Sequence, residues 1–396
     1  MRSHCIRREI VVVLALGFLM IACGCDMHFG NWSRAKYEKV SNHQAPLSTG
    51  GTLDVATDSG SIRITGDEIT ECRIEATIVA HAPTEEEAQE LAEQVQIRLD
   101  TADDTLKVRA DKPHLTNNRS IAVSYVITAP RQVNVLCESD YGSLGVTDLA
   151  GTVKGRTSSG SVTAEKIEGP VDLNTSYGSI SCEDLAGPTI LLHSSSGSIS
   201  VTGLKGSAKI ETAYGSVSCE DASGESLDLR TSSGQISLTN VSFPECLAET
   251  DYGAIGCDTF AGKMIKLRSS SGSVELTDAR ADTIDLDTSY GRVEGRGITT
   301  GNLQAHSGSG GIDLACSESC PADLKAEVKT SYGSISFRAP PAFSGEVRLT
   351  TEYGSVRTAL PVQVVGKVEK NHLAGGIGEG TGLIHLETAS GSIELR

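Results

Sequence analysis

Aromatic side chains are scarce in this chain of 396 residues, which contains 6 Phe, 1 Trp and 9 Tyr. Seven of the nine tyrosines stand directly before a glycine, so they belong to a repeated motif. A core with so little Phe and Trp must be thin and built from Val, Ile, Leu and Thr. Such a core argues against a large enzyme with an aromatic-lined pocket.

Positively charged residues are also few. The chain contains 34 Lys and Arg and 51 Asp and Glu, which gives a formal net charge of −17. Contacts with nucleic-acid phosphates need clustered Lys and Arg, so we expect no nucleic-acid partner. The motifs G-x-S-x-G, H-E-x-x-H and C-x-x-C and the phosphate loop are missing from the sequence. We therefore expect no catalytic residue, no cofactor and no metal, and we predict that the protein is not an enzyme.

Two acidic pairs, Glu183–Asp184 and Glu220–Asp221, are weak candidates for Ca²⁺ ligands. The Asp-rich nonapeptide of calcium-binding β-rolls is missing around them. Their place between apolar runs favours solvated turn residues, and we interpret them so.

Long apolar runs are limited to residues 10–21, which follow a basic stretch and end in M-I-A-C-G-C at 20–25. The run is too short for a permanent membrane span. It resembles a bacterial lipoprotein signal peptide, whose invariant cysteine is acylated and becomes the new N-terminus. We predict a signal peptide over 1–22 and lipidation of Cys23, with Cys25 as the alternative. An ordinary secretory peptide or an uncleaved anchor is the competing interpretation.

A glycine preceded by Tyr or Ser recurs along most of the chain at intervals of 18 or 19 residues. The regular copies are Gly142, Gly160, Gly178, Gly197, Gly215, Gly234, Gly253, Gly272, Gly291 and Gly310. Gly333 and Gly354 continue the series less regularly, and Gly60 and Gly391 are outlying copies.

Aligning the copies on their glycine gives two short strands in each unit. Apolar residues stand seven and five positions before the glycine and two and four positions after it, and Thr or Ser stands three before it. Alternation with period two marks strands that bury one face. One unit cannot bury its own apolar face, but stacked units can. We predict an all-β fold, a right-handed single-stranded β-solenoid of 18–19-residue coils over 136–360. A β-sandwich of hairpins is the alternative.

The two ends depart from the repeat. Residues 23–47 lack periodicity and predict a tether. Within 48–135, residues 83–96 predict a helix, with a capping box at Thr84 and Glu87 and acidic residues in its first turn. We expect this helix-bearing segment to cap the solenoid, since open strand edges pair between molecules. In the C-terminal segment, 361–396, an interruption precedes a final coil.

Three sequence features resemble a known bacterial family. They are the T-x-x-G-S-I repeats, V-I-T-A-P at 126–130 after the acidic helix, and a closing G-x-G-x-G…T-x-x-G-S-I at 376–393. The family is that of the putative adhesins, β-strand-repeat proteins of unknown function, and the resemblance covers about 48–396. It implies a cell-envelope β-solenoid with no established catalysis, and it transfers no functional residue.

Four positions before the glycine, successive coils alternate in charge. The residues are Glu211, Arg230, Glu249, Arg268 and Asp287. Neighbouring strands lie about 4.8 Å apart, so we predict a ladder of opposite charges on the outer surface.

Tyrosine and serine alternate directly before the glycine. The tyrosines are Tyr141, Tyr177, Tyr214, Tyr252, Tyr290 and Tyr332. The buried positions stand seven, five and three residues before the glycine. The tyrosine stands one residue before it and so has the same parity, which favours a ring that points inward and closes the core. The alternative is an outward stripe that contacts a ligand, with rings about 9.6 Å apart, comparable to the disaccharide repeat of an extended glycan. Contact with a protein partner is a third interpretation.

Cysteine occupies one inward position on alternate coils at Cys182, Cys219 and Cys257. A spacing of about 9.6 Å exceeds disulfide reach, so we interpret these residues as small buried hydrophobes. Pairing of Cys246 with Cys257, and of Cys316 with Cys320, stays open.

The sequence as a whole predicts a non-catalytic module, tethered to the membrane of a bacterial cell envelope through its lipid anchor and facing the periplasm or the exterior. It would bind a polysaccharide or an envelope protein. The alternative is a structural or envelope-stress-associated protein that interacts with other membrane proteins.

Overall fold

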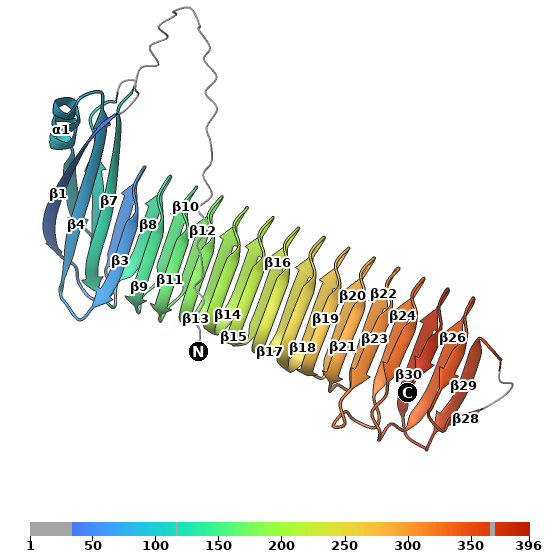
Figure 1. Cartoon of the computed structure of the whole chain (residues 1–396). Helices are drawn as coiled ribbons and strands as arrows, with labels where there is room; N and C mark the ends of the chain where they lie inside the picture. The colour runs from blue at the N-terminus through green and yellow to red at the C-terminus, as the bar shows by residue number, and fades with distance from the viewer. Residues whose placement is uncertain (1–33, 116–117, 365–368) are drawn as a thin grey trace, which may run out of the picture.

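The computed structural model describes residues 34–115, 118–364 and 369–396. They form a long stack of similar coils with one helix, α1, at the N-terminal end (Figure 1). Each coil contributes strands to two walls that face one another across a thin core. The predicted β-solenoid is confirmed. The predicted lipidation residues, Cys23 and Cys25, lie outside the described residues.

The first wall ends at the turn glycines. In spatial order its strands are β5 (Gln96–Ala102), β6 (Thr105–Asp111), β2 (Thr52–Thr57), β8 (Asn134–Ser139), β10 (Val153–Thr157), β12 (Val171–Thr175), the C-terminal halves of β13 (Ile180–Ser194) and β14 (Ile199–Thr212), β16 (Ser226–Thr231), the C-terminal halves of β17 (Ile236–Thr250) and β18 (Ile255–Ser269), β20 (Thr283–Thr288), β22 (Asn302–Ser307), β24 (Lys325–Thr330), β30 (Gly382–Thr388), β26 (Gly345–Thr351), β29 (His372–Ile377) and β28 (Gln363–Val364).

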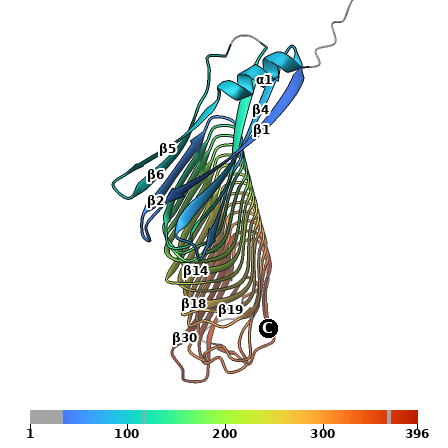
Figure 2. The ribbon, with the colours of Figure 1, turned by 90° about the vertical axis from the view of Figure 1, so that its left-hand side faces the viewer.

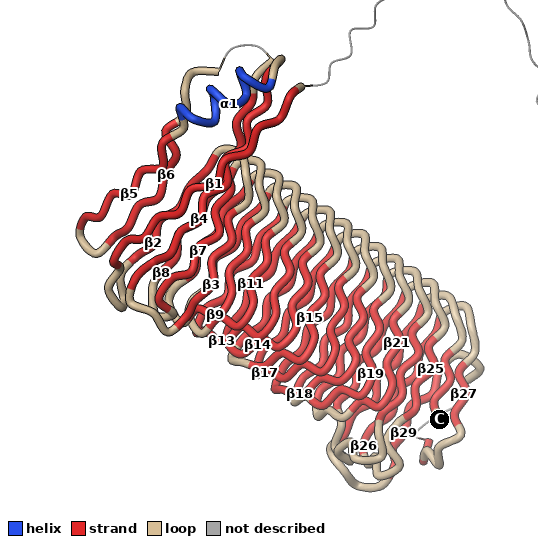
Figure 3. Tube along the Cα trace, turned by 60° about the vertical axis from the view of Figure 1, so that its left-hand side comes forward, coloured by secondary structure: helices blue, strands red, loops and turns tan. Residues whose placement is uncertain are grey.

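The second wall begins after the turn glycines. Its strands are β1 (Ala35–Pro46), β4 (Glu71–Ala82), β7 (Ser120–Pro130), β3 (Ile62–Asp67), β9 (Leu144–Leu149), β11 (Val162–Ile167), the N-terminal halves of β13 and β14, β15 (Val217–Ser223), the N-terminal halves of β17 and β18, β19 (Val274–Arg280), β21 (Val293–Ile298), β23 (Ile312–Cys316), β25 (Ile335–Arg338), β31 (Ile393–Leu395) and β27 (Val356–Thr358). Figure 3 shows both walls as strand and the turns as loop along the edges of the stack.

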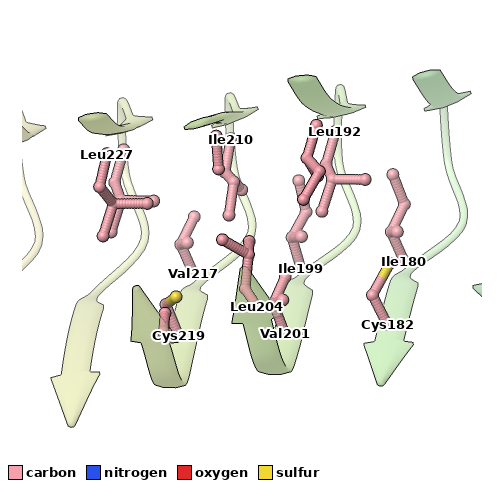
Figure 4. Close-up of a cluster of buried hydrophobic side chains, with 14 of the residues drawn as sticks. Ile180, Cys182, Leu192, Ile199, Val201, Leu204, Ile210, Val217, Cys219 and Leu227 are labelled. Carbon is pink, nitrogen blue, oxygen red and sulfur yellow. The ribbon is translucent and has the colours of Figure 1, made fainter. Parts of the chain in front are cut away.

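The repeat keeps equivalent residues in register along each wall. Leu192 pairs with Ile210, and Ile210 pairs with Leu229, in parallel ladders. Side chains of the two walls point toward one another in Figure 4 and are almost fully buried. Since each inward row is continued by the next coil, a thin layer composed mostly of Val, Ile and Leu excludes water with only a few aromatic residues, such as Phe243, Phe260 and Phe337.

A buried hydroxyl fixes the turn between the two walls. Thr231 donates to the carbonyl oxygen of Gly215 on the preceding coil at 2.9 Å and accepts the N–H of Gly234 on its own coil at 3.1 Å. A Cβ atom on Gly234 would overlap that same carbonyl oxygen, so only glycine permits the approach. The same pair of bonds recurs at Thr175 and Ser307, among others.

The N-terminal region differs from the prediction at one point. Residues 35–46, expected within a tether, form β1, which pairs antiparallel with β4. Its inward positions include Lys39, Ser41 and His43 and are only partly buried, because β1 is the outermost strand of its wall. The sequence therefore lacks the apolar alternation that marks a strand.

The predicted helix is present as α1, Glu85–Gln94, with Thr84 as its N-cap. Thr84 accepts the backbone N–H of Glu87 at 3.3 Å, as half of a capping box does. Ala88, Leu91 and Ala92 are buried, and the helix packs on β1 and β4 at the end of the solenoid (Figure 2). No helix in the described ranges has the length and hydrophobicity of a membrane span.

The C-terminal coils do not follow sequence order. β30 and β31, which flank Gly391, pair with the Gly333 coil on one side and with the Gly354 coil on the other. The expectation that Gly354 directly follows Gly333 is wrong. The interruption expected after residue 361 contains β28 and β29, which pair antiparallel beyond β26 and form the end of the wall.

All eight cysteines in the described ranges are buried free thiols. The prediction that Cys182, Cys219 and Cys257 act as small core residues is confirmed, since each is at most 3% exposed. Burial raises the pKa of all three thiols to about 12. The pairs that the sequence left open, Cys246 with Cys257 and Cys316 with Cys320, carry no disulfide in these residues.

We predict that Thr231→Val lowers the free energy of unfolding by about 1–3 kcal/mol, because it leaves a buried carbonyl and a buried N–H without their hydroxyl partner. Thr231→Ser keeps the hydroxyl and is the matched control, since serine holds the same place on other coils. Chemical denaturation measures both variants. Equal stability of the valine and serine variants would show that the hydroxyl contributes nothing.

The buried thiols predict that the fold weakens in alkali. Their pKa in the folded chain, about 12, lies above the ordinary value of 9.0, so the folded state keeps protons that the unfolded state releases. The contribution of each thiol to the free energy of unfolding is therefore complete below pH 9 and is lost as the pH rises toward 12. At about pH 10.5 each thiol has lost about 2 kcal/mol of this contribution.

The test compares wild type with the variant Cys182→Ala, Cys219→Ala. Denaturation midpoints are measured under reducing conditions from about pH 8 to about pH 10.5. The variant starts less stable, but its stability should decline less steeply with pH. Parallel pH profiles would contradict the assignment of this decline to the thiols.

A tyrosine and serine edge beside a charged groove

The tyrosines before the turn glycines point outward. Tyr141, Tyr177, Tyr214, Tyr252, Tyr290 and Tyr332 are 71–73% exposed, and Tyr353 is 81% exposed. The inward orientation favoured by parity is therefore wrong. On each coil that carries one of these tyrosines, the strand of the first wall ends three residues before the glycine, and the next two residues lie in a bend, so alternation no longer fixes their direction.

Tyr353 belongs to the same row, although it was not among the tyrosines predicted to form it. The signal was present, because Tyr353 precedes Gly354 just as the other tyrosines precede their glycines. The row together with the serines between its members forms a continuous strip that we name the Tyr–Ser edge. Its residues in spatial order are Ser59, Tyr141, Ser159, Tyr177, Ser196, Tyr214, Ser233, Tyr252, Ser271, Tyr290, Ser309, Tyr332, Ser390 and Tyr353.

The backbone beneath the rings is held between coils. The N–H of Tyr252 donates to the carbonyl oxygen of Ser232 at 3.0 Å, and the N–H of Tyr290 donates to that of Ser270 at 3.1 Å. The glycine N–H groups that follow Tyr252 and Tyr290 are in turn bound by the buried hydroxyl of their turn. The exposed rings therefore stand on a backbone whose position is fixed from coil to coil.

The predicted charge ladder lies beside the middle of this edge. Glu211 stands opposite Arg230, Arg230 opposite Glu249, Glu249 opposite Arg268, and Arg268 opposite Asp287 in the strand register. Arg230 contacts Glu249 at 3.3 Å and Asp228 at 2.9 Å, and the hydrogen bond with Asp228 raises the pKa of the guanidinium. Arg268 contacts Asp285 at 3.1 Å. The register of the ladder is confirmed.

An open groove of about 560 Å³ follows the ladder. The charged residues of its lining are Glu211, Arg230, Glu249, Asp251, Arg268 and Asp287. His193 also lines it, and Ser232, Ser270 and Ser289 connect it to the turns that carry the tyrosines. We name it the ladder groove. Carboxylates accept and guanidinium groups donate hydrogen bonds, so the groove can bind a neutral polar chain at several points while the exposed rings contact its apolar faces.

The acidic pairs near the opposite corner have a structural explanation. Asp184 and Asp221 adopt φ of 54° and 53°, in the left-handed region that Asp tolerates better than most residues. Gly203 occupies the equivalent corner on the coil between them, with φ of 72°. The described residues contain no group of three or more candidate metal ligands.

Several solved structures have low similarity to this chain. A putative adhesin from Parabacteroides distasonis is 12% identical, with 76% of this chain and 97% of that chain covered and a TM-score of 0.34. A putative adhesin from Bacteroides fragilis is 14% identical, with 90% and 97% covered and a TM-score of 0.26. A putative lipid binding protein from Parabacteroides distasonis is 12% identical, with 90% and 96% covered and a TM-score of 0.21.

Among curated proteins no match reaches significance. A protein-family model does match, and it does so twice in succession, over residues 84–258 and over residues 220–396. The two matches together span the helix, the repeated coils and the C-terminal end. The chain therefore belongs to the Toastrack DUF4097 family.

Proposed function

We propose that this protein is a non-catalytic binding or adhesion module of the bacterial cell envelope and that the Tyr–Ser edge is its contact surface. The observation that supports this most is the exposure of the tyrosine row, 71–81%, in a chain that buries nearly every other large apolar side chain of its repeats. Exposed apolar surface that is aligned rather than scattered marks an interaction site. Tyrosine suits such a site, because its ring offers an apolar face and a polar tip.

The length of the row favours an extended ligand. The tyrosines from Tyr141 to Tyr353 span about 58 Å at about 4.8 Å per coil. No enclosed pocket accompanies them in the described part of the chain, where the ladder groove is open along its length. The proposed ligand is therefore a polymer, a polysaccharide or an extended protein segment, which contacts many coils weakly and gains affinity from their number.

A tether would hold this surface at the membrane. We place the attachment at Cys23, with Cys25 as the alternative, and the protein on the periplasmic or exterior side of a bacterial membrane. A single acyl chain gives marginal membrane binding, whereas an anchor with several chains is stable. The solenoid would then present its edge to polymers of the envelope or beyond it.

The binding proposal predicts that Tyr214→Ala, Tyr252→Ala and Tyr290→Ala together weaken retention on insoluble cell-wall or matrix polymers by at least tenfold, about 1.4 kcal/mol. Retention of the purified full-length protein is measured by co-sedimentation. The melting temperature should change little, because exposed side chains contribute little to stability.

A matched control removes exposed apolar side chains elsewhere. Val40 on β1 and Val126 on β7 are 51% and 43% exposed and lie off the edge. The variant Val40→Ala, Val126→Ala should keep full retention. Retention that survives loss of the three rings would exclude the edge as the contact surface.

The anchoring proposal predicts that Cys23→Ser with Cys25→Ser moves the protein from the membrane fraction to the soluble fraction. The single variants identify the acylated residue, because only the loss of that residue should release the protein. Fractionation followed by immunoblotting measures the outcome. Unchanged membrane retention of the double variant would contradict a lipid anchor at this site.

A further inference from the structure

Tyrosine and serine alternate without exception in space, although they do not in sequence. Along the chain, Tyr332 and Tyr353 belong to consecutive turns, which breaks the alternation. In the structure the Gly391 coil lies between these two coils and places Ser390 between the two rings. At the other end, Ser59 precedes Tyr141 across the pairing of β2 with β8. The period of two coils is therefore a property of the folded surface.

The fold itself does not demand this period. Coils with Tyr and coils with Ser have the same turn, in which a buried hydroxyl binds the preceding glycine carbonyl, as at Thr250 before Tyr252 and Ser269 before Ser271. The exposed rings take no part in the core. Crowding does not forbid tyrosines on neighbouring coils either, since aromatic rings on adjacent strands about 4.8 Å apart stack favourably.

From the Tyr214 coil to the Tyr290 coil, the charges of the ladder follow the same period and phase. Coils that carry Tyr214, Tyr252 and Tyr290 have Glu211, Glu249 and Asp287 in the ladder groove. The coils between them, with Ser233 and Ser271, have Arg230 and Arg268. Between the Tyr214 and Tyr290 coils the surface thus presents one ring, one ladder carboxylate and one guanidinium about every 9.6 Å, two coil steps. Toward the C-terminal end the phase is reversed, since Lys329 lies on the Tyr332 coil and Glu387 on the Ser390 coil.

A ligand that contacts successive tyrosines in the same way must have a repeat length equal to the distance between them. An extended peptide strand repeats every two residues at about 6.6–6.8 Å and would drift out of phase within a few rings. A polyproline II helix turns in about 9.3 Å, but it offers apolar ridges and no hydroxyls for the alternating acids and bases. A disaccharide of an extended β-linked glycan is about as long as two coils. Its sugar rings have apolar faces and rims of hydroxyl groups.

We propose that the ligand is a linear β-linked glycan that lies along the solenoid axis, with one disaccharide on every two coils. This rests on the proposed function of the Tyr–Ser edge. Each tyrosine packs on the face of one sugar ring. Hydroxyl groups of the same disaccharide donate to the carboxylate and accept from the guanidinium of the ladder groove. Affinity then rises with glycan length, because each added disaccharide contacts one more ring.

A register swap tests the proposal. The variant Tyr252→Ser, Ser271→Tyr keeps the number of rings, the net charge and the turn, but moves one ring by one coil. Wild type, the swap and Tyr252→Ser alone are titrated with β-1,4-linked N-acetylglucosamine and glucose oligomers, as tetrasaccharide and decasaccharide. Calorimetry on the full-length protein measures affinity, and thermal melting confirms that each variant is folded.

We expect the decasaccharide to bind wild type at least tenfold more tightly than the tetrasaccharide. The swap should lose as much decasaccharide affinity as Tyr252→Ser alone, because the moved ring meets the neighbouring sugar, which the β-1,4 linkage turns over relative to the sugar that Tyr252 contacts. Tetrasaccharide affinity should change less, since the rings on the other coils keep their spacing. α-1,4-linked glucose oligomers, which coil, should bind weakly to all three proteins.

Other outcomes separate the glycan proposal from the proposed function. If the swap binds the decasaccharide as tightly as wild type while the three-ring variant does not, the register is wrong and the edge remains a binding surface. If no β-linked oligomer binds but a proline-rich peptide binds in a way that needs the tyrosines, the ligand class is wrong. If the three-ring variant binds every probe as wild type does, both proposals are wrong.

Discussion

The contact between one turn glycine and the next is the constraint on which the whole solenoid depends. The carbonyl oxygen of each glycine occupies the space that a Cβ atom of the following glycine would fill, and a buried Thr or Ser hydroxyl binds that oxygen. The hydroxyl also holds the glycine N–H of its own coil. Coils are thereby fixed at one spacing, and the positions just before the glycine are freed from packing. A rigid inner turn thus allows an outer surface that varies.

The contact also explains why so thin a core is sufficient. Parallel ladders carry each inward row from coil to coil, so Leu192, Ile210 and Leu229 form part of one continuous apolar layer. Small residues such as Cys219 pair with larger ones such as Leu238 on the next coil. The interior contains few aromatic rings, and the fully buried ones are Tyr125, Phe243, Phe260 and Phe337.

The structure was predicted best at positions where one structural role requires a particular residue type. Glycine at a fixed interval with Thr or Ser three residues earlier identified the turn, the coil length and the register, and the Thr84–Glu87 pair identified the helix. Prediction failed where position in the stack, rather than residue type, decides the structure. Residues 35–46 form a strand because β4 offers an edge, although their inward side chains are largely polar.

The candidate site was harder to predict than the fold. The tyrosines were identified, but their direction depends on a bend that begins two residues before the glycine, where strand parity ends. The completeness of the alternation depends on Ser390, which reaches its place only because the last coil inserts between two earlier ones. The spacing of the repeats along the sequence does not show which distant coils pair, because the strands of every coil present the same hydrogen-bonding edge.

That insertion makes the end of the chain a closing element. A solenoid made in sequence order can add coils one at a time during synthesis, up to the coil of Gly333. The Gly354 coil is made next, yet its neighbour in the stack, β30 with β31, is synthesised only after it. A chain cut short before β30 would leave the open edge of β24 unpaired beside a detached coil. The native order of the last coils therefore forms only after β30 and β31 have been synthesised, and until then β24 has an open strand edge of the kind that can pair between molecules.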